Sequence, residues 1–292
     1  MASWKRRCVQ IAATITSNSY FNGFVEGSIY RGNLKKVCIP GLNCYSCPGA
    51  LGSCPIGSLQ AVIGSINYNL SLYVLGFLIL AGTLMGRLVC GWLCPFGFIQ
   101  ELLHKIPSPK IKFGAKATQL KYLKYIVLAG FVVILPAFVV NEAGIGAPAF
   151  CKYICPAGTL EGGLPLVLLN ESLRSALGPL FVWKLALLVL TIAFSIIIFR
   201  PFCRFICPLG AVYALFNAVS LYRFEIDAGK CTGCGECSRT CPMGVKVCEN
   251  PNDPECIRCG DCIEHCPQNA ISSHYVLMER SVLSPEITKH NE

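Results

Sequence analysis

The most constraining feature of this 292-residue sequence is a cysteine spacing that occurs twice near the C-terminal end. Each run reads C-x2-C-x2-C-x3-C-P, in which three thiolates bind one [4Fe-4S] cluster and the fourth reaches a neighbouring cluster. Structural zinc sites need two C-x2-C pairs rather than a triple run ending in Cys-Pro. We therefore expect two clusters, one bound by Cys231, Cys234, Cys237 and Cys266, the other by Cys256, Cys259, Cys262 and Cys241.

Residues 225–272, which contain both runs, are rich in Cys, Gly and Pro and are expected to fold as an α+β two-[4Fe-4S] bacterial-ferredoxin-like domain. Residues 273–292 are expected to form a polar tail. Cys248 lies in the insert between the runs and is expected to pack rather than to bind iron.

Residues 1–224 have the composition of a membrane domain. The whole chain is 53% hydrophobic and 14% charged, and a spanning helix needs about 20 apolar residues. Ser65–Leu88, Tyr122–Val140 and Leu180–Phe199 meet this requirement, and Cys8–Val25 is either a weaker fourth span or a helix lying in the membrane interface. We expect an all-α transmembrane bundle of three to four spans, with residues 147–169 re-entering the bilayer without crossing it.

The charges predict the orientation. Residues 1–224 carry 19 basic and 5 acidic side chains, gathered near the apolar runs, especially in the loop from Arg87 to Lys124. Basic loops remain cytoplasmic, so we expect a multi-pass protein of the cytoplasmic (inner) membrane with its ferredoxin domain in the cytoplasm. Residues 225–270 carry 8 acidic and 4 basic side chains, which argues against a nucleic-acid partner.

A second cysteine motif recurs in the membrane part. The pattern R-x2-C-x3-C-P-x-G begins at Arg87 and again at Arg200, each time after a long apolar run, so both copies face the same side. Two thiolates from each copy make one four-ligand site, and the adjoining arginines are candidates for stabilising a reduced cluster. The expected ligands are Cys90, Cys94, Cys203 and Cys207.

A third copy, Cys151-x3-Cys155-Pro, follows the expected span Tyr122–Val140. It is therefore expected on the opposite face of the membrane. The favoured ligand set there is Cys47, Cys54, Cys151 and Cys155, with Cys44 as a replacement for Cys47. A rival set uses Cys38, Cys44, Cys47 and Cys54 alone. The hydrocarbon core is about 30 Å thick, so this outer cluster must be sunk into the protein to exchange electrons with the others.

With its Cys90-Gly-Trp-Leu-Cys94-Pro95 and Cys203-Arg-Phe-Ile-Cys207-Pro208 motifs and its ferredoxin runs, the chain resembles the NapH-type membrane iron–sulphur proteins. Their relatives include the membrane parts of NosR and CcoG and polyferredoxins of anaerobes. The resemblance implies electron transfer between a quinol or cytoplasmic donor and a partner oxidoreductase or maturation system. The additional cysteines depart from the minimal pattern, so a nitrate-reductase role is not carried over.

The expected function is electron transfer by four [4Fe-4S] clusters, from the cytoplasmic ferredoxin domain to a membrane or extracytoplasmic redox partner, within a complex. No catalytic residue is identified, so the chain is expected to be a carrier or a subunit rather than a stand-alone enzyme. Two alternatives are a redox maturation factor for another metalloenzyme and a quinone-reactive subunit. A quinone site could use Trp92, Glu101 and His104, although scattered polar residues more often form the wet face of a helix.

Overall fold

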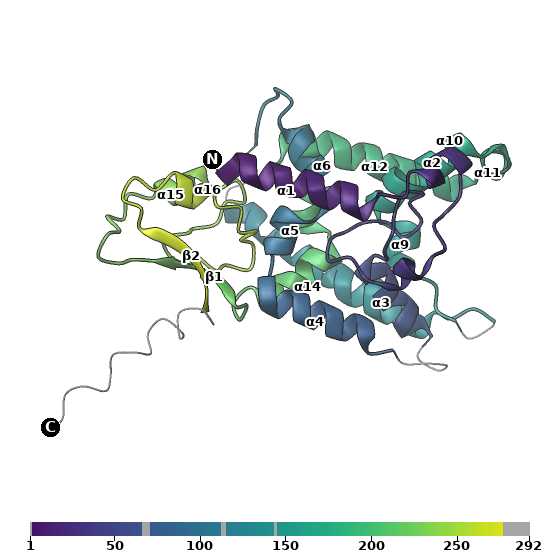
Figure 1. Cartoon of the computed structure of the whole chain (residues 1–292), viewed down its shortest axis with the longest axis horizontal. Helices are drawn as coiled ribbons and strands as arrows, with labels where there is room; N and C mark the ends of the chain where they lie inside the picture. The colour runs from purple at the N-terminus through teal and green to yellow at the C-terminus, as the bar shows by residue number, and fades with distance from the viewer. Residues whose placement is uncertain (1, 66–70, 112–114, 143–144, 277–292) are drawn as a thin grey trace.

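The computed structural model describes residues 2–65, 71–111, 115–142 and 145–276. Their arrangement is mostly helical (Figure 1). The helical part occupies one end of the long axis of the molecule and the ferredoxin-type module occupies the other. The N-terminus lies beside the module, and α1 runs from there along the helical part.

The helical part begins with a series of mostly short elements. They are α1 (Ala2–Ser17), α2 (Asn22–Glu26), η1 (Asn33–Lys36), α3 (Pro55–Gly64), α4 (Tyr73–Met85), α5 (Leu88–Trp92), α6 (Pro95–His104), η2 (Ala115–Tyr122), α7 (Leu123–Val127), η3 (Leu128–Ile134) and α8 (Leu135–Phe138). The second half contains α9 (Ala149–Tyr153), η4 (Gly158–Gly163), α10 (Leu164–Leu169), α11 (Glu171–Ser175), α12 (Pro179–Ile197), α13 (Pro201–Phe205) and α14 (Pro208–Phe216).

Two described helices are long and apolar enough to cross a membrane, judged by length and composition. One is the continuous helix Gln119–Phe138, which contains a π-helical stretch at η3. The other is α12, Pro179–Ile197. They correspond to two of the expected spans, and the expected total of three to four is not confirmed.

The other two expected spans differ from the structure. Of Ser65–Leu88, residues 66–70 lie outside the described residues, and α4 covers only 13 residues because Gly86 ends it with a φ of +55°. The prediction of a single helix over Cys8–Val25 is wrong, since α1 ends at Ser17 and α2 starts only at Asn22. The segment 147–169 consists of short helices, none of spanning length.

The ferredoxin-type module is closed by a two-stranded antiparallel sheet. Strand β1 (Tyr222–Ile226) pairs with β2 (Ile271–Tyr275), and Phe224 lies opposite Ser273. Between the strands lie two short helices, α15 (Glu236–Thr240) and α16 (Asp261–Glu264), each following a cysteine loop. The sheet therefore brings the two ends of the module together around both cysteine runs.

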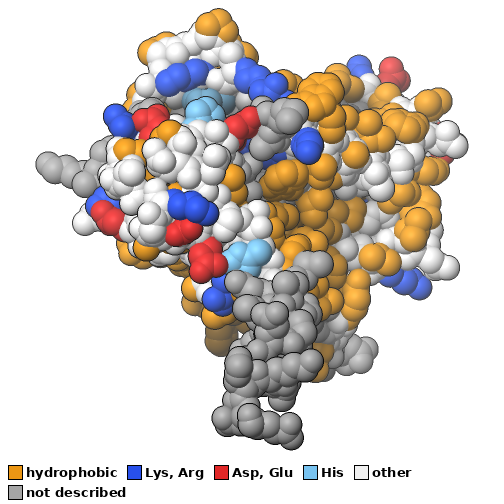
Figure 2. Space-filling view, turned by 60° about the vertical axis from the view of Figure 1, so that its left-hand side comes forward, with side chains coloured by type: hydrophobic (Ala, Val, Ile, Leu, Met, Phe, Trp, Pro, Cys, Tyr) orange, Lys and Arg blue, Asp and Glu red, His pale blue; other side chains and the backbone are white. Residues whose placement is uncertain are grey.

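The surface divides in the same way as the fold. In Figure 2, hydrophobic side chains gather over the helical part and charged side chains over the module in front. On α12 the exposed side chains include Val182, Val189 and Phe194, and on the other long helix they include Ile126 and Phe138. A soluble protein rarely exposes so much contiguous apolar surface, so these faces support association with a membrane.

Candidate iron–sulphur sites

The cysteines of the first ferredoxin run lie around one small cavity. Cys231, Cys234 and Cys237 line it together with Cys266 from the second run. The backbone N–H of Ala270 donates to the Cys266 sulfur at 3.3 Å, and such amide hydrogen bonds help to set cluster potentials. Cys248, which we expected to pack rather than to bind iron, also lines this cavity.

The second ferredoxin set lies directly beside the first. Burial, together with the nearby charges of Cys256, Cys241 and Cys237, raises the pKa of Cys262 to about 12. Cys241 belongs to the first run, so the two runs exchange their fourth cysteines in space. The backbone N–H of Val245 donates to the Cys241 sulfur at 3.4 Å.

Four buried cysteines form the inner set of the helical part. An apolar helix ends shortly before each C-x3-C-P motif. The helix after each motif starts at the proline of the motif, a residue that suits the first helical position. The N–H groups of Gly97 and Gly210 each donate at 3.4 Å to the sulfur three residues earlier. The members of the inner set are Cys90, Cys94, Cys203 and Cys207.

Two buried arginines join the halves of the inner set. Arg87 donates to the carbonyl oxygen of Cys203 at 3.2 Å, and Arg200 donates to the carbonyl oxygen of Cys90. Arg200 holds a left-handed backbone (φ +48°) before a proline, which is costly for a residue with a side chain. Its ion pair with Glu101 at 2.9 Å helps to hold it there.

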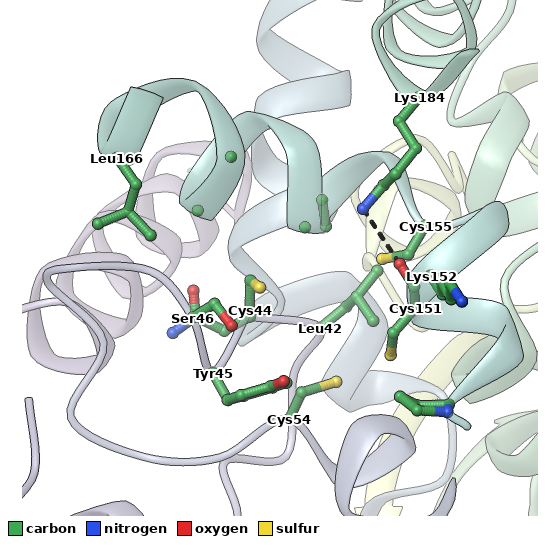
Figure 3. Close-up of a pocket in the computed structure, with 16 residues that line it drawn as sticks. Leu42, Cys44, Tyr45, Ser46, Cys54, Cys151, Lys152, Cys155, Leu166 and Lys184 are labelled. Atoms are coloured by element: carbon green, nitrogen blue, oxygen red, sulfur yellow. Dashed lines mark hydrogen bonds between the residues drawn. The ribbon is translucent and has the colours of Figure 1, made fainter. Parts of the chain in front are cut away.

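The outer set lines a cavity of about 380 Å³ in the helical part (Figure 3). The sulfurs of Cys44, Cys54, Cys151 and Cys155 lie around this cavity, and Lys184 donates to the carbonyl oxygen of Cys151 at 3.1 Å. Cys47, which the sequence favoured as a member, does not line it, and Cys44 takes that place.

Cys44 is held in the outer set by a contact that is distant in sequence. Its backbone N–H donates to the buried carboxylate of Glu161 at 2.6 Å. The Cys47 thiol instead approaches Asn18 Oδ1 at 3.5 Å. Cys38, which the rival ligand set required, is buried but does not line the cavity either.

A glutamine occupies the same place in the inner set and in the outer set. The sequence-based prediction did not include either glutamine. Gln100 Nε2 donates to the Cys203 sulfur at 3.0 Å while its Oε1 accepts the Phe202 N–H at 3.2 Å. Gln60 Nε2 donates to the Cys151 sulfur at 3.2 Å while its Oε1 accepts the Phe150 N–H at 2.9 Å. The signal was present in the sequence, because each glutamine stands six residues after a Cys-Pro cysteine.

The inner set and the outer set are neighbours inside the protein. Burial raises the pKa of Cys94 to about 12, while the backbone N–H of Leu42 lies close enough to lower it. Leu42 also lines the outer cavity. The Tyr213 hydroxyl donates to the carbonyl oxygen of Pro40 at 2.9 Å, in the same segment. A few residues therefore separate the inner and outer sets.

The second ferredoxin set lies directly against the inner set. Gly91, next to Cys90, faces the loop of Cys256 and Cys259 so closely that a Cβ there would overlap the carbonyl oxygen of Ile257. Trp92 Nε1 donates to the carbonyl oxygen of Arg258 at 2.9 Å. The loop that holds one thiol set is thus packed on the backbone that holds the next.

The residues considered for a quinone site have other contacts. The Trp92 indole binds the module, Glu101 pairs with Arg200, and His104 packs edge-on against Phe199. These contacts hold the parts of the protein together.

The donor sets fit iron–sulphur clusters. Each set has four thiols with N–H donors around it. Among the described residues, the buried Nε atoms of Arg87 and Arg200, which adjoin the inner set, have no hydrogen-bond partner. Within the same residues, no group of three or more His, Cys, Asp or Glu side chains could hold a single metal ion. A cubane binds its thiolates through four different irons, so its ligands are spread more widely than those of one zinc.

Comparison with protein families gives the same chemistry. A model described as "4Fe-4S binding domain" matches residues 66–114, 125–164 and 180–225. Two further models with that description match residues 223–245 and 252–272. The matches therefore include the helical part as well as the ferredoxin-type module.

Relatives among curated proteins cover most of the chain. An uncharacterised protein of Methanocaldococcus jannaschii is 28% identical over 78% of this chain and 89% of its own length. The ferredoxin-type protein NapH of Haemophilus influenzae is 24% identical over 82% of this chain and 74% of its own.

A third relative is larger. The regulatory protein NosR of Pseudomonas aeruginosa is 26% identical over 57% of this chain, which spans only 21% of NosR. No solved structure matches the chain. Together with the motifs and the thiol sets, these matches support a NapH-type, polyferredoxin-like iron–sulphur protein related to NosR.

Proposed function

We propose that this chain is a membrane-bound relay that moves electrons between a cytoplasmic donor or acceptor and a redox partner in the membrane or beyond it. The observation that carries the proposal is the succession of four thiol sets, each close to the next. The Cys237 set adjoins the Cys262 set, the Cys259 loop packs on Gly91, and Leu42 lies between the inner and outer sets.

The proposed ligands follow these sets. The module would hold two [4Fe-4S] clusters with the exchanged fourth cysteines, and the helical part would hold two more, the outer one through Cys44. Each bound cluster supplies one-electron redox chemistry. The chain contributes burial, N–H donors to sulfur and fixed cations near the inner set. The proposed ligands are Cys231, Cys234, Cys237, Cys266, Cys241, Cys256, Cys259, Cys262, Cys90, Cys94, Cys203, Cys207, Cys44, Cys54, Cys151 and Cys155.

The proposed topology places the ferredoxin-type module in the cytoplasm, with residues 1–224 as the membrane domain and residues 225–272 as the module. Lys105 and Lys110 follow α6, and Lys121, near the start of the helix Gln119–Phe138, lines a surface pocket with Arg204, the residue after Cys203 of the inner set. Basic loops favour the cytoplasmic side. Helices Gln119–Phe138 and α12 would cross the bilayer fully, and the shorter α1 packs on α5 and α6 while α4 packs on α3 and α14.

The test is the iron and acid-labile sulphide content of protein purified without oxygen, with EPR of the reduced form. We expect about sixteen irons per chain from four cubanes. Cys90→Ser and Cys203→Ser should each remove the same EPR signal. About eight irons, unchanged in both variants, would mean that only the ferredoxin-type module binds clusters and would contradict the relay.

A further inference from the structure

Cys248 is a fifth cysteine at the first ferredoxin site. It lies in the segment between the two runs, and its side chain lines the same cavity as the four cysteines of that set. Its sulfur is 3.1 Å from the Cys237 sulfur. The segment between the runs thus returns to the cavity and brings a thiol directly against one of the proposed ligands.

The second site has no equivalent of Cys248 among the described residues. Cys262 occupies the place in the second run that Cys237 occupies in the first. The thiols whose charges act on it are Cys256, Cys241 and Cys237, all members of the four-cysteine sets. The extra thiol is therefore a particular property of the first site and not of the ferredoxin-type fold.

Cys248 is also open to the outside. It is an exposed cysteine, and it lines a surface groove with Phe224, Asn252 and His274 in addition to the cavity. An exposed side chain can rotate into the cavity without the repacking that a buried one requires. Cys237, in contrast, is buried.

We propose that Cys248 is an exchangeable ligand for the iron that Cys237 binds. In the exchange the bond from iron to the Cys237 sulfur breaks and a bond from iron to the Cys248 sulfur forms. The proton of the Cys248 thiol passes to the Cys237 sulfur, so that no electron is gained or lost and no further reactant is needed. The inference rests on the proposed function, since it requires a cluster at this site.

The experiment compares Cys237→Ala, Cys248→Ala and the double variant, with Cys262→Ala as the matched control. Iron and acid-labile sulphide are measured per chain, and the ferredoxin-type EPR signals are recorded. We expect Cys248→Ala and Cys237→Ala each to keep the wild-type iron content, the latter with an altered signal. The double variant should lose about four irons, as should Cys262→Ala.

Alkylation provides a second readout that does not depend on recovering iron. Cys248 should react with iodoacetamide in the intact wild-type protein and become protected in Cys237→Ala, as read by mass spectrometry. The proposal is overturned if Cys237→Ala loses as much iron as the double variant or cannot be recovered at all, or if Cys248→Ala alone loses the cluster. Absence of iron from the wild-type module would instead refute the proposed function.

Discussion

Gln100 joins the two halves of the inner site, because its side-chain N–H donates to the Cys203 sulfur while its carbonyl oxygen holds the Phe202 N–H. The reduced cluster carries one more negative charge, so a donor aimed at a ligand sulfur stabilises the reduced form more than the oxidised form. The same arrangement at Gln60 and Cys151 predicts the same effect at the outer site.

We expect Gln100→Leu to lower the midpoint potential of the inner cluster and Gln60→Leu that of the outer one. A charge-assisted hydrogen bond contributes about 1.5–3 kcal/mol in total. Only part of this changes with oxidation state, and 59 mV corresponds to about 1.4 kcal/mol for one electron, so the shift should be a few tens of millivolts. Redox titration followed by EPR measures it.

Gln10→Leu is the matched control for this prediction. Gln10 is equally buried, but its Nε2 donates to the Gly91 carbonyl oxygen and to Glu101, not to a sulfur. Its replacement should leave both midpoint potentials in place. Equal shifts in Gln10→Leu and Gln100→Leu would mean that burial of a polar group, and not the N–H···S contact, sets the potential.

Gly91 determines how closely the ferredoxin-type module approaches the inner site. Because a Cβ there would overlap the Ile257 carbonyl oxygen, Gly91→Ala must push the loop of Cys256 and Cys259 away from Cys90. Electron exchange between these two sites should slow, measured as delayed reduction of the inner cluster after rapid mixing with a reductant of the module. A wild-type rate in Gly91→Ala would show that this contact is not on the electron path.

Gly76→Ala is the control for Gly91→Ala. Gly76 lies in α4, and among the described residues outside its own turn of helix no atom lies within 4 Å of the place a methyl group would take, so alanine should fit. Alanine in a helix interior is favoured over glycine by about 0.8–1.0 kcal/mol. We expect this variant to transfer electrons at the wild-type rate and to be slightly more stable.

Arg87 anchors the module to the helical part. Its fully buried guanidinium donates to Glu255 at 2.7 Å and to the Pro254 carbonyl oxygen at 2.8 Å. Removing one partner of an isolated buried pair costs about 3–5 kcal/mol because the other charge is left without compensation. Glu255 also pairs with the buried Lys124, so Arg87→Met should lower the free energy of opening of residues 252–258 by less than this amount, as measured by hydrogen exchange.

Lys246→Met tests whether the loss of stability expected in Arg87→Met arises because the Arg87 ion pair is buried. Lys246 forms an exposed pair with Glu249 three residues later, and exposed pairs contribute little to stability. We expect no measurable change in the opening of residues 252–258. If Arg87→Met behaved in the same way, the module would be held by its apolar contacts instead.

Local spacing predicted much of this protein, and long-range contacts account for most of the rest. The expected cysteine sets of the module follow from a repeat within residues 231–266, and the two motifs that begin at Arg87 and Arg200 match position by position. The end of α4 depends on a single backbone conformation at Gly86, which hydropathy does not reveal. The position of Cys44 in the outer set depends on the hydrogen bond of its N–H to the Glu161 carboxylate, 117 residues away. No local sequence pattern contains such a contact.

The choice between Cys44 and Cys47 at the outer site gives the last prediction. Cys44 lines the cavity with Cys54 and Cys151, whereas Cys47 approaches Asn18 and does not line it. We expect Cys44→Ser to remove the EPR signal of the outer cluster and about four irons per chain. Cys47→Ser should keep both, and because the two positions are three residues apart, a general disturbance of this loop would affect both variants. Loss of the signal in Cys47→Ser with retention in Cys44→Ser would reverse the assignment and require the loop to rearrange when the cluster binds.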